Sequence, residues 1–239
     1  MRRYLIFVLI SLMELVGFAQ KQGPNRVDSL LNEFNQAHDD ATKLKLLLDI
    51  MTTYNYFNQQ KGLQYESLAI ETARRLGSNS DMANVKNVVG RLHWREGNFQ
   101  GALRNHNEAK QIFEEEKNKE KIAVTIRYLG QDYADAGNYA EAQQYFQKAL
   151  TMYQEMNDRL NMAYMYDLLN WLYGKQGNYV EASKYAYTTL RLFEDMGDQD
   201  NAALAASNIA ENYIHLGNYT DALKYFKRSH SVTKPRAIY

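Results

Sequence analysis

The stretch GNYAEAQQYFQKAL, residues Gly137–Leu150, decides the fold because the chain returns to the same pattern at a fixed interval. Its counterparts are GNFQGALRNHNEAK from Gly97, GNYVEASKYAYTTL from Gly177 and GNYTDALKYFKRSH from Gly217, so the four glycines lie forty residues apart. A fixed period of about 20 to 50 residues is typical of chains that stack copies of one small structural unit. The sequence therefore predicts a repeat architecture.

Aligning the four copies on their glycines shows which positions keep their residue type. Small residues stand fourteen positions before and five positions after each glycine: Ala83, Ala123, Ala163 and Ala203, then Ala102, Ala142, Ala182 and Ala222. An aromatic residue stands four positions before each glycine: His93, Tyr133, Tyr173 and Tyr213. Along each helix the positions that keep their residue type are separated by 3, 4 or 7 residues or by sums of these, so they lie on one helix face. Small side chains on that face let two helices approach closely. Each copy is therefore expected to form a helix, a tight Gly-Asn turn and a second helix.

The composition of the 239 residues narrows the class of protein. Lysine plus arginine equals aspartate plus glutamate, 28 against 28, so no net charge attracts the chain to nucleic acid or to a membrane surface. The only prolines are Pro24 and Pro235, which leaves the interior free for long helices. Cysteine is absent, so packing rather than disulfide bonds is expected to hold the fold.

The stretch YLGQDYADAGNYAEAQQYFQKAL, residues Tyr128–Leu150, resembles the tetratricopeptide repeat. That family's pattern is a leucine-glycine pair, a tyrosine, a Gly-Asp/Asn-Tyr turn, and then alanine, an aromatic residue and alanine. The usual repeat has 34 residues, whereas the unit here has 40, a longer form similar to repeats of bacterial exported sensor and scaffold proteins. The resemblance covers roughly residues 42–233. It implies an all-α fold, a right-handed superhelical solenoid of antiparallel helix pairs.

The expected organisation follows from this alignment. A signal peptide at 1–19 is followed by a segment at 20–41 that contains one capping helix. Five helix pairs then occupy approximately residues 42–78, 79–118, 119–158, 159–198 and 199–233, and a tail covers 234–239.

The first nineteen residues have the order of a secretory signal peptide. Arg2 and Arg3 are followed by an apolar run at 4–16 and by a small-x-small cleavage site that ends at Ala19. The apolar run is shorter than the roughly 20 residues of a membrane span, so an uncleaved anchor is the lesser alternative. We expect cleavage after Ala19, no stable membrane insertion afterwards, and a periplasmic or extracellular protein.

In tetratricopeptide arrays the first helix of each pair lines a concave groove that holds peptides, and the resemblance implies such a groove here. Carried over one by one, the lining positions are Asn87, Arg91, Trp94 and Arg95; Arg127, Tyr128 and Gln131; Tyr164, Asp167, Trp171 and Lys175; and Asn208, Glu211 and His215. Some members of the family clamp a partner's terminal carboxylate. Asn87 stands where the first lysine of that clamp would be, so the clamp is not predicted.

The last copy ends without a polar helix to cover it. Leu223, Tyr225 and Phe226 lie at positions that face the next repeat in earlier copies. Solenoids normally need a polar end for solubility. This face is expected to meet a partner or a second copy of the chain, unless the chain is a fragment of a longer protein. We hypothesise self-association through these three residues, which would form a homodimer.

The sequence contains no recognisable catalytic or metal-binding motif. The phosphate-binding loop, the dinucleotide fingerprint, the zinc-protease motif, the serine-hydrolase elbow and a cysteine nucleophile are all missing. His93 and His106 replace a tyrosine and a phenylalanine of the repeat, so they are interpreted as packing residues rather than metal ligands. No cofactor and no metal are expected.

These observations favour a non-enzymatic scaffold that binds a protein or peptide of unknown identity in the groove, with no nucleic-acid partner. One alternative is a periplasmic sensory input module of a truncated or split signal-transduction protein, such as a histidine kinase. A second is an accessory array of a hydrolase or lectin subunit, which no residue specifically supports.

Overall fold

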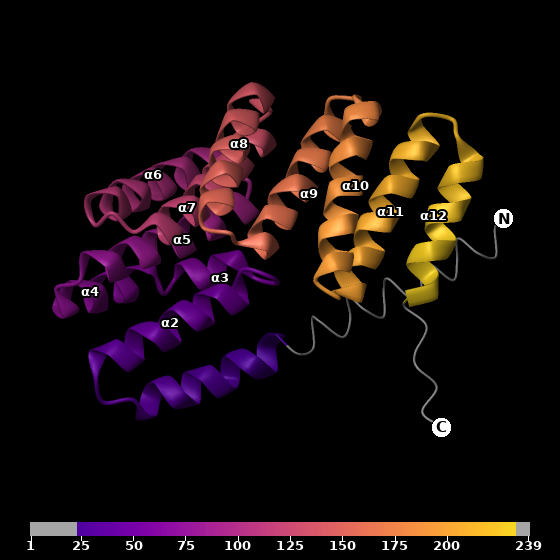
Figure 1. Ribbon diagram of the computed structural model, residues 1–239. Helices are drawn as coiled ribbons and strands as arrows, with labels where there is room; N and C mark the ends of the chain where they lie inside the picture. Colours follow the sequence, from indigo (N-terminus) through magenta and orange to yellow (C-terminus); the bar gives the residue numbers. More distant parts are fainter. Residues whose placement is uncertain (1–22, 233–239) are drawn as a thin grey trace. The chain divides into compact units, whose positions relative to one another are not determined.

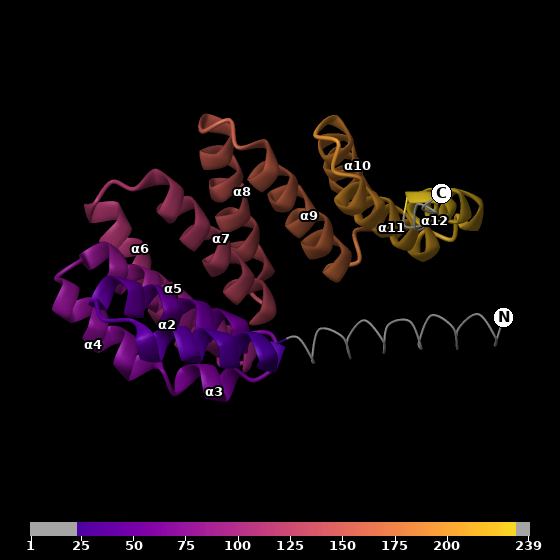
Figure 2. The ribbon, with the colours of Figure 1, turned by 90° about the horizontal axis from the view of Figure 1, so that it is seen from below.

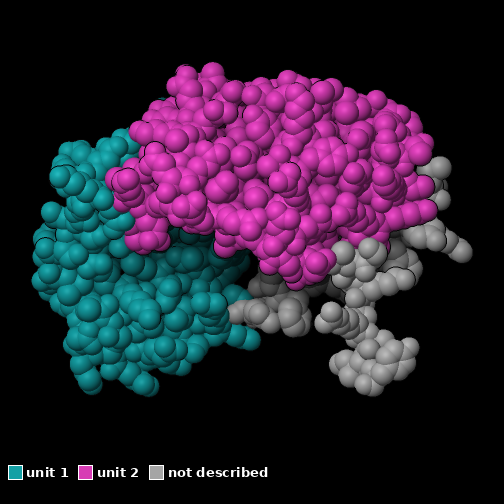
Figure 3. Space-filling view, in the orientation of Figure 1, with its two compact units in different colours: residues 1–118 teal, residues 119–239 magenta. Residues whose placement is uncertain are grey.

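The computed structural model describes the backbone of residues 23–232, and the predicted signal peptide and tail lie outside this range. Every regular element in the described range is an α-helix (Figure 1). The predicted all-α class is therefore confirmed. The chain divides into two compact units, residues 1–118 and 119–239, which Figure 3 colours separately and which are described one at a time.

Unit 1 begins with a helix at residues 23–36, followed by α2 (Asp40–Tyr54), α3 (Gln59–Leu63), α4 (Glu66–Leu76), α5 (Asn79–Arg95) and α6 (Phe99–Glu115). Val27 and Leu30 of the first helix are buried against Ile50 and Tyr54 of α2, so this helix covers the apolar side of α2. Burial of such side chains contributes about 1.5–3 kcal/mol each.

The first repeat of unit 1 departs from the expected helix pair. Its second half forms two short helices, α3 and α4, rather than one continuous helix. Gly62 lies near the break, and a Cβ at this position would lie 2.8 Å from Cδ2 of Leu92. Glycine weakens a helix interior, and here the neighbouring side chain requires it, so close packing is retained at the expense of helix continuity.

Unit 2 contains three regular helix pairs: α7 (Lys119–Asp135) with α8 (Tyr139–Glu155), α9 (Arg159–Lys175) with α10 (Tyr179–Asp195), and α11 (Gln199–His215) with α12 (Tyr219–Val232). Figures 1 and 2 show α9, α10 and α11 following one another side by side. The first helices of the pairs begin at Lys119, Arg159 and Gln199, forty residues apart, in phase with α5 at Asn79 of unit 1.

The Gly-Asn turn joins the two helices of a pair by a specific backbone geometry. Gly177 has a φ of 74°, a left-handed conformation that ends α9 and that residues with a side chain rarely adopt. The next residue, Asn178, is the N-cap of α10, and its side chain accepts a hydrogen bond from the backbone N–H of Glu181 at 3.2 Å. The turn therefore ends one helix and starts the next within two residues.

Paired tyrosines pack the two helices of each regular pair together. The ring centroids of Tyr133 and Tyr145 lie 5.2 Å apart, and those of Tyr173 and Tyr185 lie 5.3 Å apart, both in stacked arrangements. The tyrosine before each turn thus stacks on a tyrosine of the second helix. This repeated contact explains much of the unusual tyrosine content.

Candidate protein-binding face

The candidate residues of unit 1 lie on α5. Arg91 and Trp94 are half-buried and Arg95 is exposed, with its guanidinium carbon 4.8 Å from the centroid of the Trp94 ring. Asn87 differs from the expectation, because only 7% of its surface is exposed. It lies in the packed interior beside the second helix of its own pair, where the ring of His106 contacts its backbone oxygen. Asn87 is therefore not an accessible lining residue.

The candidate residues of unit 2 lie on the first helices of its three pairs. We call this surface the first-helix face; its residues are Arg127, Tyr128 and Gln131 of α7, Tyr164, Asp167, Trp171 and Lys175 of α9, and Asn208, Glu211 and His215 of α11. Tyr164, Lys175, Glu211 and His215 are exposed and the others are half-buried. All ten are accessible to some degree.

Cations lie over aromatic rings in both units. On the first-helix face the guanidinium carbon of Arg127 lies 4.9 Å from the centroid of Tyr128, and Nζ of Lys175 lies 5.7 Å from that of Trp171. Such contacts contribute about 0.5–1 kcal/mol at exposed sites and hold the cation in one place. The cations and aromatic residues chosen from the sequence as independent contacts thus act as pairs.

Arg127 is held in place without a carboxylate partner. Its Nε is buried and has no hydrogen-bond partner among the described residues, where no ion pair of Arg127 is found. The fully buried hydroxyl of Tyr153 on α8 lies nearby and also lacks a partner at hydrogen-bonding distance. Burial raises the pKa of Tyr153 to about 12, although the Arg127 cation opposes this rise.

Asp167 carries the opposite charge to Arg127. Its carboxylate is largely buried and has no cationic partner among the described residues. Nδ2 of Asn208 donates a hydrogen bond of 2.8 Å to its Oδ1, which joins α11 to α9. No ion pair of Asp167 is found among the described residues. Burial raises the pKa of this carboxyl, and the hydrogen bond from Asn208 offsets only part of that rise.

His215 and Glu211 complete the face on α11. The ring of His215 stacks on that of Tyr179 with centroids 4.2 Å apart and an angle of 4° between the planes. This stack holds the imidazole flat against α10. Glu211 is exposed, so its carboxylate is available to solvent and to a ligand.

The C-terminal helix exposes two of the three apolar residues expected there. Leu223 is 55% exposed and Phe226 39%. Tyr225 differs from the expectation, because its ring packs against Tyr213 of α11 at 6.0 Å and Tyr187 of α10 at 5.6 Å between centroids. It is the last member of the stacked tyrosine series and does not belong to an open end.

Comparison with an earlier copy gives a reason for the exposure of Phe226. Its counterpart Phe146 is fully buried, and Phe146 Cδ1 lies 2.5 Å from where a Cβ on Gly130 would be. The last copy has Ala210 in place of that glycine, so Phe226 cannot approach the facing helix as closely.

The histidines occupy packing positions. His106 is 1% exposed, and its ring fills the space left by the missing side chain of Gly90, with Nε2 only 2.5 Å from where a Cβ would be. His93 lies 3.3 Å through Nδ1 from the side-chain amide of Asn98. Within the described part of the chain, no group of three or more His, Cys, Asp or Glu side chains could hold a metal ion.

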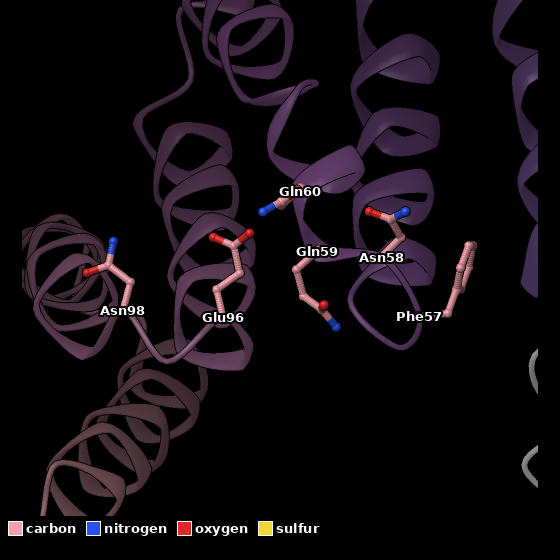
Figure 4. A pocket seen from close by; sticks show the side chains of 6 residues that line it. All are labelled: Phe57, Asn58, Gln59, Gln60, Glu96 and Asn98. Atoms are coloured by element: carbon pink, nitrogen blue, oxygen red, sulfur yellow. The ribbon is translucent and has the colours of Figure 1, made fainter.

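Two shallow hollows lie away from all the candidate residues. One, of about 520 Å³ in unit 1, is lined by Phe57, Asn58, Gln59, Gln60, Glu96 and Asn98 (Figure 4). The other, of about 490 Å³ in unit 2, is lined by Ala140, Gln143, Gln144 and Gln147 of α8. None of the candidate residues lines either hollow. Between residues 23 and 232, no helix has the length and apolar character needed to span a membrane.

Sequence reasoning missed the hydroxyl of Tyr153. A signal was present in the alignment, because Phe113 and Phe193 occupy the same position in the neighbouring copies. The copy that has this tyrosine is also the only one of the four with an arginine in the column of Arg127. The two unusual residues therefore occur in the same copy, which is the signal that sequence reasoning could have used.

Solved structures with the same fold share little sequence with this chain. BtubC from P. vanneervenii is 16% identical with a TM-score of 0.70, and 94% of this chain and 96% of that one are covered. The STAND protein PH0952 from Pyrococcus horikoshii, described as having a tetratricopeptide repeat sensor, is 18% identical with a TM-score of 0.74; the match covers 93% of this chain and 36% of that protein. A Rap protein complexed with Competence and Sporulation Factor is 17% identical with a TM-score of 0.61, and 90% and 71% are covered.

No match was found among curated proteins. The family model for the tetratricopeptide repeat, in contrast, matches residues 81–155 and 161–234, which is more than half of the chain. This match and the helix pairs agree with the resemblance seen in the turns. The fold is typically that of a non-catalytic, protein-binding scaffold. The chain belongs to the tetratricopeptide repeat family.

Proposed function

We propose that this chain is an exported, non-enzymatic scaffold that binds a protein or peptide through the first helices of its repeats. The observation that carries the proposal is the first-helix face of unit 2, where Arg127 and Asp167 have no counter-ion among the described residues and Trp171 is partly exposed. Charged groups without partners, next to aromatic side chains, are features of surfaces that bind partners.

The similar structures support the same kind of function. One is a Rap protein in complex with Competence and Sporulation Factor, and another is named for a tetratricopeptide repeat sensor. Export rests on the N-terminal pattern alone, with Arg2, Arg3 and the small-x-small site before Gln20. Gln20 should therefore be the first residue of the mature protein, which N-terminal sequencing of the exported protein tests.

The proposal is tested by affinity capture from cell-envelope extract with the full chain as bait. An Arg127→Ala/Trp171→Ala variant removes one arginine and one aromatic ring from the first-helix face. The matched control, Arg191→Ala/Tyr56→Ala, removes the same types of group from exposed positions elsewhere. A partner held by the parent and the control but lost by the first variant supports the proposal. A partner held equally by all three refutes the assignment to this face, provided that circular dichroism shows equal folding.

The alternative function is sensory input to a signal-transduction protein. The name of the Pyrococcus horikoshii protein joins a tetratricopeptide repeat sensor to a signal-transduction ATPase. A gene directly downstream that begins with a membrane helix and encodes a signalling domain would favour this alternative. Co-purification of that product with this chain would then test it.

Self-association through the C-terminal helix is a separate proposal. Leu223 and Phe226 expose 55% and 39% of their surfaces. Paired copies would shield this apolar area from water. Light scattering at tens of micromolar should give a dimer for the parent and a monomer for Leu223→Ser/Phe226→Ser. A monomeric parent would refute the proposal.

A further inference from the structure

Two charges of opposite sign on the first-helix face occupy equivalent positions in successive repeats. Arg127 of α7 and Asp167 of α9 are forty residues apart and stand in the same column of the alignment. The same column holds Ser207 in the next copy. Moving along unit 2 by one repeat therefore exchanges a cation for an anion at an otherwise equivalent place on the face.

Arg127 is arranged to receive an anion. The ring of Tyr128 holds the guanidinium from one side, at 4.9 Å, and packing buries Nε. The hydroxyl of Tyr153 lies beside it, is fully buried and has no hydrogen-bond partner among the described residues. A neutral phenol can accept a hydrogen bond but cannot neutralise a guanidinium. The cation and its remaining N–H donors thus stay uncompensated.

The aromatic column shows that this hydroxyl is not needed for packing. Phe113 and Phe193 fill the equivalent place in neighbouring copies and are as buried as Tyr153. An unpaired buried hydroxyl costs about 1–3 kcal/mol, so a phenylalanine would be the more stable choice for packing alone. The hydroxyl lies close enough to Arg127 for that cation to oppose the rise in the Tyr153 pKa, so it is placed to orient the guanidinium without a direct hydrogen bond.

Asp167 is arranged to receive a cation. The amide of Asn208 fixes Oδ1 by a hydrogen bond of 2.8 Å, and a single neutral donor leaves the carboxylate charge uncompensated. The ring of Tyr164 is exposed one helical turn before it, and that of Trp171 is partly exposed one turn after it. Aromatic and aliphatic surface beside a carboxylate suits the stem and head of a lysine or arginine side chain.

We infer that the first-helix face of unit 2 binds an extended peptide that carries an acidic and a basic group, the acidic group pairing with Arg127 and the basic group with Asp167. This inference rests on the proposed peptide-binding function and adds the charge pattern of the ligand. The Asp167 carboxylate and Nε of Arg127 are largely buried, so a counter-charge from the ligand offsets part of a desolvation cost that folding has already met. A peptide with two charges of one sign would meet repulsion at one of the two positions, which gives the face selectivity for mixed sign.

The first experiment selects peptides without assuming their sequence. A phage library of random 12-residue peptides is panned against the full chain and against the single variants Arg127→Gln and Asp167→Asn. Peptides selected by the parent should be enriched in both acidic and basic residues at a preferred spacing. The Arg127→Gln variant should lose the acidic enrichment only, and the Asp167→Asn variant the basic enrichment only.

The second experiment measures the two pairings directly. The affinity of one selected peptide is measured by fluorescence anisotropy for the parent and both variants, and again after its basic residue is replaced by glutamine. Asp167→Asn should weaken binding of the original peptide about tenfold or more, and should have little effect on the replaced peptide. Replacing the acidic residue of the peptide by glutamine gives the corresponding test of Arg127. Arg127→Gln should then weaken binding of the original peptide but have little effect on the replaced one. Glu211→Gln, which removes an exposed carboxylate from the same face, is the control and should change affinity less than Asp167→Asn.

The outcomes separate this inference from the proposed function. Selected peptides without mixed charge, or a charge preference that survives in both variants, would overturn the inference while leaving peptide binding intact. Failure to select any peptide would count against peptide binding itself and with it the inference. Tyr153→Phe offers a further check, because loss of the hydroxyl should weaken binding of the acidic group without lowering stability.

Discussion

Nδ2 of Asn212 donates a hydrogen bond of 2.8 Å to Oδ1 of Asn170, and the two buried side chains join the first helices of successive repeats. Asn170 is not typical of its column in the alignment, where the other copies have Gly90, Gly130 and Ala210. The column of Asn212 holds Leu92 and Leu172, but also the buried Asp132. The two asparagines therefore pair with each other at places that a neighbouring copy fills with Ala210 and Leu172.

Removing one member of this pair should cost more than removing both. Asn212→Leu leaves the Asn170 amide buried and unpaired, which should lower the free energy of unfolding by about 1–3 kcal/mol. The double variant Asn170→Ala/Asn212→Leu restores the residues of other copies and should be more stable than Asn212→Leu. Urea denaturation of the parent, the single variants Asn170→Ala and Asn212→Leu, and the double variant measures the coupling between the two side chains. Additive effects would show that the hydrogen bond does not couple the two repeats.

Gly130 should tolerate no side chain, in contrast to Gly174. A Cβ on Gly130 would lie 2.5 Å from Phe146 Cδ1, whereas nothing lies within 4 Å of one on Gly174. Gly130→Ala should therefore destabilise the protein by about 1–3 kcal/mol, because the core is overpacked. Gly174→Ala, the same change within a helix, should stabilise it by about 0.5–1 kcal/mol. Thermal unfolding that shows the same sign for both variants would contradict the packing seen here.

Lys117 occupies a turn that favours glycine. Between successive pairs the left-handed position is held by Gly77, Lys117, Asn157 and Gly197, and Lys117 has a φ of 56°. A residue with a side chain loses about 1–2 kcal/mol of stability in this conformation, and glycine avoids that loss. Glycine also has more freedom in the unfolded chain, which reduces the gain in stability from the substitution. Lys117→Gly should therefore raise the free energy of unfolding by about 0.5–1 kcal/mol.

The reverse change serves as the control for Lys117. Gly137 has a φ of 84° and open space around it, so Gly137→Ala tests the backbone conformation without a steric contact. It should destabilise the protein by about 1 kcal/mol. Denaturant titration of both variants should give changes of opposite sign, and stabilisation by Gly137→Ala would count against the turn geometry.

Asp167 should make stability depend on pH. Burial raises the pKa of this carboxyl in the folded protein above its ordinary value of 3.8. The folded state therefore binds the proton more tightly, so ionisation of Asp167 destabilises the protein increasingly as the pH rises from 3.8 through the folded pKa. Asp167→Asn should be more stable than the parent at pH 7, and this advantage should shrink as the pH falls toward 4. An advantage that grows on acidification would contradict the burial of Asp167.

The sequence by itself determined the repeat, the helix pairs and the turns. The left-handed glycine, the asparagine N-cap and the spacing of small residues act over a few neighbours, so each copy specifies its own local structure. The pair expected at residues 42–78 is less regular, because its second half forms the two short helices α3 and α4. There the packing of Leu92 against Gly62 involves residues far apart in the chain, which local patterns cannot reveal.

Only the tertiary structure decided which candidate residues are accessible and which charges are left without partners. It buries Asn87, it packs Tyr225 against Tyr187 and Tyr213, and between residues 23 and 232 it gives Arg127 and Asp167 no counter-ion. The column of a residue gives the helix face on which it lies. Its exposure and its electrostatic partners depend on the side chains of the neighbouring helices, because burial and pairing are properties of a contact between helices and not of one position in the chain.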